Sequence, residues 1–197
     1  MLKLKRHQVI LLTIFVLTVV IRLVLAFSSP NFTYDSYFHF RQVEHITETG
    51  LPLYDDPLSY GGRELIVLPL FHYLASFFTL LIPLSVVAKI LPNILFACLG
   101  LIVYLIALKI SKKKYAALFS ALIASLLPIT FQTNSFTPLP FALFFIFTCI
   151  YCFINIPSAK SNKYLYLYLI SITLLFFSGS FGIILIISLL FYSILSM

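Results

Sequence analysis

All six carboxylate side chains of this protein fall within one stretch of thirty residues near the amino terminus. They are Asp35, Glu44, Glu48, Asp55, Asp56 and Glu64. Carboxylate oxygens are the ligands that Mg²⁺ and Mn²⁺ prefer, and such ions stabilise negative charge on phosphate groups during transfer reactions. Any chemistry that depends on acids or on a divalent metal ion is therefore expected in this stretch.

Asp35 and His39 lie four residues apart at the start of this stretch. On a helix this spacing places both side chains on one face, which suits a metal ion or a phosphate-bearing substrate. Both residues are therefore candidate metal ligands. The alternative is that Asp35 only caps the helix and that His39 is an ordinary interfacial residue.

Asp55 and Asp56 are adjacent and precede Pro57. Two neighbouring carboxylates in a loop can hold Mg²⁺ or Mn²⁺ and bridge the ion to a substrate phosphate. The alternative is an Asp-Pro turn with one solvated neighbour.

Three basic residues are candidates for binding the phosphate of a substrate: Arg22, Arg41 and Lys89. Arg22 lies inside the first apolar run, where an ionisable group is a functional candidate by default. An arginine can bind a phosphate with two parallel hydrogen bonds. Arg22 and Lys89 could equally extend to the lipid headgroups without binding a substrate.

The composition excludes a soluble domain. Of 197 residues, 61% are hydrophobic and 10% are charged, whereas soluble domains have about 25% charged residues. The net charge of +7 comes from short basic clusters between apolar runs. Membrane orientation explains such clusters, so nucleic-acid binding is excluded.

The apolar runs predict an all-helical, multi-pass membrane protein with about six spans. The expected spans are residues 8–27, 90–108, 115–131, 138–157, and two helices within 164–197 separated by Ser178-Gly179-Ser180. Residues 64–84 are also apolar. The two possible topologies divide the twelve lysine and arginine residues other than Arg22 differently. If residues 64–84 do not cross the membrane, nine of these residues lie inside and three outside. If residues 64–84 do cross, four lie inside and eight outside. The first arrangement follows the positive-inside rule.

This topology places the amino terminus in the cytoplasm and makes residues 28–88 one large external loop. Apolar residues recur with helical spacing from Asp35 to Thr49, and Gly50 follows where a helix should end. A helix over residues 35–49 is therefore predicted at the start of the acidic stretch.

Three separated segments resemble the first external loop of the catalytic subunit of oligosaccharyltransferase, with the archaeal members most similar. They are residues 35–41 (DSYFHFR), 54–62 (YDDPLSYGG) and 69–74 (PLFHYL). The resemblance implies a GT-C-like helical bundle that transfers a sugar or oligosaccharide from a polyprenyl-phosphate or polyprenyl-diphosphate donor. It also implies that Asp35 is catalytic, holding a divalent metal ion and positioning the acceptor.

Two features depart from that family. Its second acidic motif belongs in the next external loop, but residues 131–137 contain no carboxylate, and the chain contains no tryptophan. We therefore expect residues 1–197 to be one transmembrane domain. It is either the amino-terminal portion of a longer GT-C enzyme or a split homologue that needs a carboxy-terminal partner chain or domain.

The sequence thus predicts a membrane glycosyltransferase with Mg²⁺ or Mn²⁺ as cofactor. Its partners would be membrane lipids, a polyprenyl-linked sugar donor and a protein or lipid acceptor, with protein asparagine favoured. The resemblance favours an archaeal-like cell membrane over the endoplasmic reticulum. The alternative is a non-catalytic membrane protein, either a lipid-carrier transporter or an accessory subunit, that uses the acidic loop only for binding.

Overall fold

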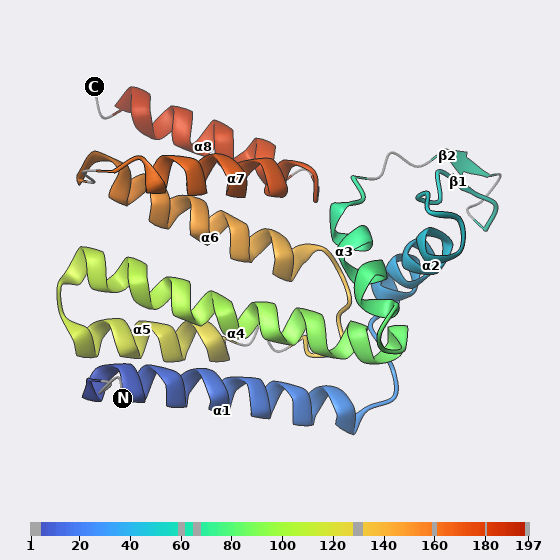
Figure 1. The fold of residues 1–197 in the computed structure, drawn as a ribbon, viewed down its shortest axis with the longest axis horizontal. Helices are drawn as coiled ribbons and strands as arrows, with labels where there is room; N and C mark the ends of the chain where they lie inside the picture. Colours follow the sequence, from blue (N-terminus) through green and yellow to red (C-terminus); the bar gives the residue numbers. More distant parts are fainter. Residues whose placement is uncertain are drawn as a thin grey trace.

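The computed structural model describes residues 5–58, 62–64, 68–127, 132–158, 161–179 and 181–195, and most of them are helical (Figure 1). The helices are α1 (Arg6–Ser28), α2 (Tyr34–Thr49), α3 (Leu70–Thr79), α4 (Leu84–Ser111), α5 (Lys114–Leu126), α6 (Leu139–Asn155), α7 (Lys163–Phe176) and α8 (Phe181–Leu195). A 3₁₀ turn, η2 (Ile156–Ser158), follows α6. Two short strands, β1 (Asp55–Asp56) and β2 (Arg63–Glu64), pair in antiparallel fashion between α2 and α3.

Helices α1 and α4 are long and apolar enough to cross a bilayer, with 23 and 28 residues. At 1.5 Å per residue they extend about 35 and about 42 Å, against a hydrocarbon thickness of about 30 Å. Helices α5, α6 and α7 are apolar but have 13, 17 and 14 residues. The expectation of about six crossings therefore stays a prediction for α5 to α8.

The long helices lie side by side, and α2 and α3 lie across one end of them (Figure 1). Helix α4 is central, because it packs against α1, α3, α5 and α6, while α7 packs against α6 and α8. The expected break in the last apolar run is confirmed, since α7 ends at Phe176 and α8 begins at Phe181. Helix α5 ends at Leu126, and residues 128–131 of the expected third span lie outside the described residues.

Close packing of α4 on α5 depends on Gly100. A Cβ atom at this position would overlap the hydroxyl oxygen of Ser125 on α5 and would lie 3.3 Å from the carbonyl oxygen of Ala121. Small residues at helix crossings let backbones approach closely, which is how apolar helices associate in a membrane.

The segment that sequence composition left ambiguous, residues 64–84, contains α3. This helix has ten residues, which corresponds to about 15 Å and is too short to cross a bilayer. Phe71 and Ala75 of α3 join Val43 of α2 and Val87 of α4 in one buried cluster. The length of α3 is compatible with the non-crossing interpretation, which stays a prediction, and α3 fixes α2 onto the end of the bundle.

Candidate functional site

Helix α2 carries Asp35 and His39 and agrees closely with the predicted helix. It ends at Gly50, whose positive φ of 78° and hydrogen bond to the carbonyl of Ile46 (2.8 Å) complete its last turn. Thr33 is the residue that precedes the first turn, and Asp35 is the second residue within it. The interpretation of Asp35 as the helix cap is therefore wrong. Its exposed carboxylate instead lies at the positive end of the helix dipole.

The first turn of α2 is tied to the loop between α5 and α6. The backbone N–H of Thr33 donates to the carbonyl of Asn134 (3.1 Å), and that of Phe136 donates to the Oγ atom of Ser36 (2.9 Å). Ser36 is fully buried. Residues 132–136 therefore contact the turn that carries Asp35. These residues belong to the loop in which the resembling family would have its second acidic motif.

His39 of α2 and His72 of α3 form a hydrogen-bonded pair. Their Nδ1 and Nε2 atoms are 2.9 Å apart, and the rings stack with centroids 5.1 Å apart. Burial lowers the pKa of His39 to about 4, although Asp35 acts in the opposite direction, and burial with the neighbouring His39 lowers the pKa of His72 to about 3. Both rings are therefore neutral at pH 7.

The shared hydrogen bond constrains which nitrogen carries each proton. The Nδ1 atom of His72 is buried and has no hydrogen-bond partner in the described part of the chain. Because a buried N–H without an acceptor is rarer than a buried lone pair without a donor, we assign the shared proton to Nε2 of His72. His39 then accepts at Nδ1 and carries its own proton at Nε2, as a hydrogen-bond donor. To bind a metal at Nε2, His39 would have to take the other tautomer.

Arg41 and Asp56 form a bidentate ion pair, with nitrogen–oxygen distances of 3.0 and 2.7 Å. The Asp56 side chain is only 4% exposed and also accepts a hydrogen bond from the backbone of Leu58. This pair fixes β1 onto α2. Asp55, the neighbouring carboxylate, is exposed and lies opposite Glu64 in the strand pair.

The described residues provide an incomplete set of ligands for Mg²⁺ or Mn²⁺. They contain no group of three or more His, Cys, Asp and Glu side chains arranged to hold a metal ion. Asp35 offers an exposed carboxylate. Asn134, in the loop beside it, has a buried side-chain oxygen that no other described residue meets with a hydrogen bond. Such oxygens suit a hard cation. The fit is therefore partial, and the predicted roles of Asp35, His39, Asp55 and Asp56 as metal ligands stay predictions.

Arg22 lies at the interface of α1 and α4 and is fully buried. Its Nε atom donates to the side-chain oxygen of Asn93 (3.0 Å), and its guanidinium carbon lies 4.5 Å from the ring centroid of Phe96. Both terminal nitrogens are buried without a hydrogen-bond partner among the described residues. The interpretation that Arg22 extends to the lipid headgroups is therefore wrong.

Lys89 lies one turn before Asn93 on α4. Its Nζ atom donates to the carbonyl of Ser29 at the end of α1 (2.8 Å). Asn93 in turn donates to the carbonyls of Lys89 (2.6 Å) and Thr133 (2.8 Å). These contacts join α1, α4 and the loop after α5 at the end of the bundle where α2 lies. Arg22, Lys89 and Asn93 thus form a polar cluster between α1 and α4.

Sequence reasoning missed several buried polar residues at this end of the bundle, and Asn93 and His72 are the most informative of them. Asn93 follows Lys89 by four residues inside an apolar run, and this spacing on one helix face was a usable signal. His72 was interpreted as an interfacial side chain, but it is only 2% exposed. Nothing in the sequence pairs it with His39, because thirty-three residues separate the two. Residues 59–61 of the resembling segments lie outside the described residues.

Two comparisons relate this chain to known proteins. Residues 67–197 match the family described as dolichyl-phosphate-mannose-protein mannosyltransferase. A relative from Archaeoglobus fulgidus, described as dolichyl-phosphooligosaccharide-protein glycotransferase 2, is 35% identical over 102 residues, which are 49% of this chain and 17% of the relative. The chain therefore spans about a sixth of that relative's length. Asp35, His39, Arg41 and both β1 carboxylates precede the range of the family match.

The family match covers about two thirds of the chain, and α1 and α4 have the length and composition of membrane spans. This chain is accordingly a membrane protein that belongs to the dolichyl-phosphate-mannose-protein mannosyltransferase family, within the GT-C membrane glycosyltransferases.

Proposed function

We propose that this chain forms part of a membrane glycosyltransferase. It would transfer a sugar or oligosaccharide from a polyprenyl-phosphate or polyprenyl-diphosphate carrier, with protein asparagine as the acceptor. The observation that carries the proposal is the exposed carboxylate of Asp35, set at the helix terminus beside the neutral His39–His72 pair. The choice of a protein acceptor is supported by the Archaeoglobus fulgidus relative, whose description names an oligosaccharide and a protein. The choice of asparagine follows from the resemblance to the catalytic subunit of oligosaccharyltransferase.

Asp35 is assigned to the acceptor side of the reaction. A carboxylate there orients the acceptor nucleophile, and its negative charge also makes it a ligand for Mg²⁺ or Mn²⁺. A divalent ion held there would stabilise the negative charge of the departing phosphate. Asp55, which is exposed, would be a second ligand, and the Nε2 N–H of His39 would be available as a hydrogen-bond donor on the same helix as Asp35. Asp56 acts indirectly by holding β1 against α2 through Arg41.

Arg22 and Lys89 are assigned to the donor side. All six carboxylates lie between residues 35 and 64, and none of the interactions described for them reaches Arg22. A buried guanidinium with two unpartnered nitrogens is costly unless an anion pairs with it. The phosphate of a lipid-linked donor is such an anion, and it enters a membrane at the level of the external loop. The exposed part of the Arg41 side chain is available for a further contact with the donor phosphate.

The test is a transfer assay on membranes that carry the full protein. A polyprenyl-linked oligosaccharide and a peptide with an acceptor asparagine are supplied with Mn²⁺, and the glycopeptide is measured. The proposal predicts product that disappears with EDTA and returns when Mn²⁺ is restored. Binding of the donor without glycopeptide, with or without metal, would instead indicate a transporter or an accessory subunit and would overturn the enzyme assignment.

We further propose that the acidic stretch faces the outside of an archaeal-like cell membrane, with the amino terminus in the cytoplasm. The position of the lysine residues supports this orientation. Lys109, Lys112 and Lys113 lie around the turn from α4 to α5, at the end of the bundle opposite α2 (Figure 1). Basic residues are enriched on the cytoplasmic side of membrane helices. Cysteine labelling from either side of sealed vesicles tests the assignment.

A further inference from the structure

The loop between α1 and α2 contains an amide group that the proposed site does not use. Residues 31–33 read Asn-Phe-Thr, and Asn31 is the only one of the chain's five asparagines that has Ser or Thr two positions later. A triplet of this form, with any residue except proline in the middle, is the acceptor for N-linked glycans. Asn31 is therefore a candidate modification site, and it lies four residues before Asp35.

The backbone carries this triplet in an extended form between two helices. Helix α1 ends at Ser28, α2 begins at Tyr34, and residues 31–33 have no regular secondary structure. Thr33 has a φ of −65° and a ψ of 154°. Successive side chains of an extended chain point to opposite sides. Asn31 and Thr33, the two residues that define the acceptor, should therefore lie on one side and Phe32 on the other.

The burial of these side chains agrees with this alternation. Phe32 is half-buried, and its ring packs edge-on against Phe40 of α2 with centroids 4.8 Å apart. Asn31 and Thr33 are both exposed. The backbone N–H of Asn31 donates to the Oγ atom of Ser29 (3.3 Å), but its side-chain amide makes no hydrogen bond to any residue that the structure describes. The packing of Phe32 thus leaves the acceptor amide facing solvent.

Hydrogen bonds on both sides of Asn31 fix the position of the segment. Before it, the carbonyl of Ser29 accepts from the Nζ atom of Lys89 (2.8 Å). After it, the N–H of Thr33 donates to the carbonyl of Asn134 (3.1 Å). Folding the segment back onto the proposed site of its own chain would break these bonds. Asn31 is therefore better placed to enter the site of another molecule.

The proposed topology puts this acceptor close to the membrane. Asn31 follows the last residue of α1 by three positions, which is at most about 11 Å of extended chain. A transferase whose site lies much farther from the bilayer cannot reach such a residue. A second copy of this chain in the same membrane has its own Asp35 on the same loop, and hence at a matching depth.

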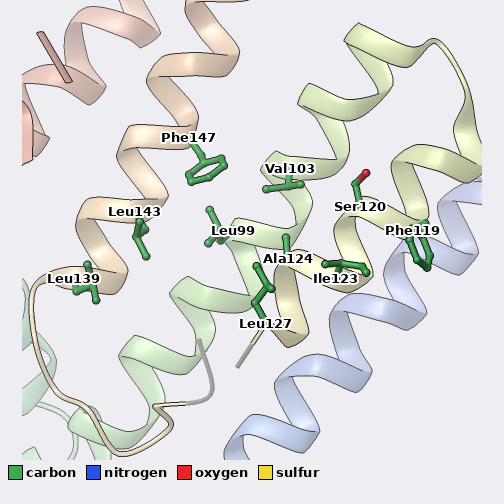
Figure 2. Close-up of a pocket in the computed structure, with 10 residues that line it drawn as sticks. All are labelled: Leu99, Val103, Phe119, Ser120, Ile123, Ala124, Leu127, Leu139, Leu143 and Phe147. Atoms are coloured by element: carbon green, nitrogen blue, oxygen red, sulfur yellow. The ribbon is translucent and has the colours of Figure 1, made fainter. Parts of the chain in front are cut away.

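The other asparagines lack this combination of properties. Asn93 and Asn155 are buried, and Asn134 is half-buried. Asn162 is exposed, but it precedes α7 at the end of the bundle opposite α2 (Figure 1). The pocket that α4, α5 and α6 form is lined by apolar side chains and by Ser120, so its lining offers no amide (Figure 2).

We propose that Asn31 is an acceptor of this protein's own transfer reaction, glycosylated by a second copy of the chain. This inference rests on the proposed function, which supplies the polyprenyl-linked donor. In the reaction the bond from the anomeric carbon to the carrier phosphate oxygen breaks, and the carrier phosphate leaves with the electron pair. A bond forms from that carbon to the Nδ2 atom of Asn31, which loses one proton to the solvent.

The first test uses membranes that carry the full wild-type protein. A polyprenyl-linked oligosaccharide and Mn²⁺ are supplied, and trypsin then releases residues 23–41, which contain Asn31 and no other asparagine. Mass spectrometry should find a glycan on this peptide only when the donor is present. An unmodified peptide would overturn the inference, and the proposed function would still stand if an added acceptor peptide were glycosylated. Glycan on neither would overturn both.

The second test identifies the atom that carries the glycan. Asn31→Gln should remove the glycan, whereas Thr33→Ser, which keeps a hydroxyl group, should retain it. Asn162→Gln is the matched control, because this exposed asparagine belongs to no acceptor triplet, and it should leave the glycan in place. Asn31→Gln should still transfer oligosaccharide to an added peptide, which also shows that the variant is folded. A glycan that persists in Asn31→Gln is linked to another side chain and would overturn the inference.

The third test asks which copy performs the transfer. Asp35→Asn keeps the acceptor but lacks the proposed reactive carboxylate, and Asn31→Gln has the reverse combination. In membranes that contain both variants, the glycan should appear on the Asp35→Asn chain, whose tryptic peptide has its own mass. Asp35→Asn alone should stay unmodified, and a glycan there would assign the reaction to another transferase. Modification of wild type without modification in the mixture would overturn transfer between copies.

Discussion

Arg41 holds both oxygens of the Asp56 carboxylate, at 3.0 and 2.7 Å, and thereby joins β1 to the middle of α2. The carboxylate is almost fully buried, whereas the Arg41 side chain is 31% exposed. Removing one member of the pair is therefore expected to cost more stability than removing the other. Losing the guanidinium leaves a negative charge in a buried position, while losing the carboxylate leaves a cation that water can reach.

Arg41→Ala is expected to lower the free energy of unfolding by about 3 kcal/mol, and Asp56→Asn by less, because only the first leaves a buried charge without its cation. Arg41→Lys should recover part of the lost stability, because lysine keeps the positive charge. The recovery should be incomplete, because lysine cannot form the bidentate pair. Asp55→Asn, at the exposed neighbour, is the control and should change stability by at most about 0.5 kcal/mol. Chemical unfolding in detergent measures all four. Equal losses for Arg41→Ala and Asp55→Asn would show that the pair has no role.

Gln42 fastens the segment before β1 to α2. Its side-chain amide donates to the carbonyl of Leu53 (2.9 Å) and accepts from the N–H of the same residue (3.0 Å), and Gln42 is fully buried. Gln42→Glu replaces the donor with a second acceptor, so the Leu53 carbonyl then faces a carboxylate. We expect a loss of about 2 kcal/mol at pH 7. The reverse change at an exposed position of the same helix, Glu44→Gln, should be nearly neutral.

The His39–His72 pair predicts how stability depends on pH. The folded-state pKa values, about 4 and about 3, lie below the ordinary value of 6.5. Below pH 6.5 the unfolded chain therefore binds protons that the folded chain does not, and the free energy of unfolding falls as pH falls. The limiting slope is about 1.4 kcal/mol per pH unit for each histidine.

Unfolding between pH 7.5 and pH 4.5 tests this dependence. His72→Phe keeps an apolar ring in the buried position and should flatten the loss of stability on the acid side. If wild type and His72→Phe lose stability with the same slope, the pair is not held neutral by the fold.

Gly100 sets the distance between α4 and α5. Gly100→Ala is expected to cost about 1–3 kcal/mol, because the added methyl group overlaps the hydroxyl of Ser125. Ser125→Ala removes that oxygen, so the double variant should recover much of the loss. The two changes must therefore be non-additive in a double-mutant cycle. Additive effects would mean that the helices separate rather than touch at this point.

The fold was predictable where one physical rule dominated. Helical spacing and Gly50 predicted α2 almost to the residue. The short length of α3 is compatible with the prediction that its segment does not cross the membrane. The lengths of α5 to α8 were not predictable in the same way. Apolar runs are continuous with loops that are themselves apolar, so composition places a helix without fixing its ends.

The candidate site was predictable only in part. Asp35 and His39 belong to one helix, and their spacing was sufficient to associate them. The partners of His39, Asp56 and Arg22 come from other elements, and they are set by how α2, α3 and α4 pack. Arg41 shows the consequence, because its spacing in the sequence gave no sign of the ion pair that it forms with Asp56. Residues that pair between different elements leave no recognisable spacing in the sequence.

The most direct measurement is the rate of oligosaccharide transfer by Asp35→Asn, in membranes that carry the full protein with donor and Mn²⁺ in excess. The change keeps the size of the side chain and removes its charge. We predict a loss of about 100-fold or more, with Glu48→Gln, an exposed carboxylate at the other end of α2, close to wild type. Undiminished transfer by Asp35→Asn would contradict the assignment of this carboxylate to the reaction.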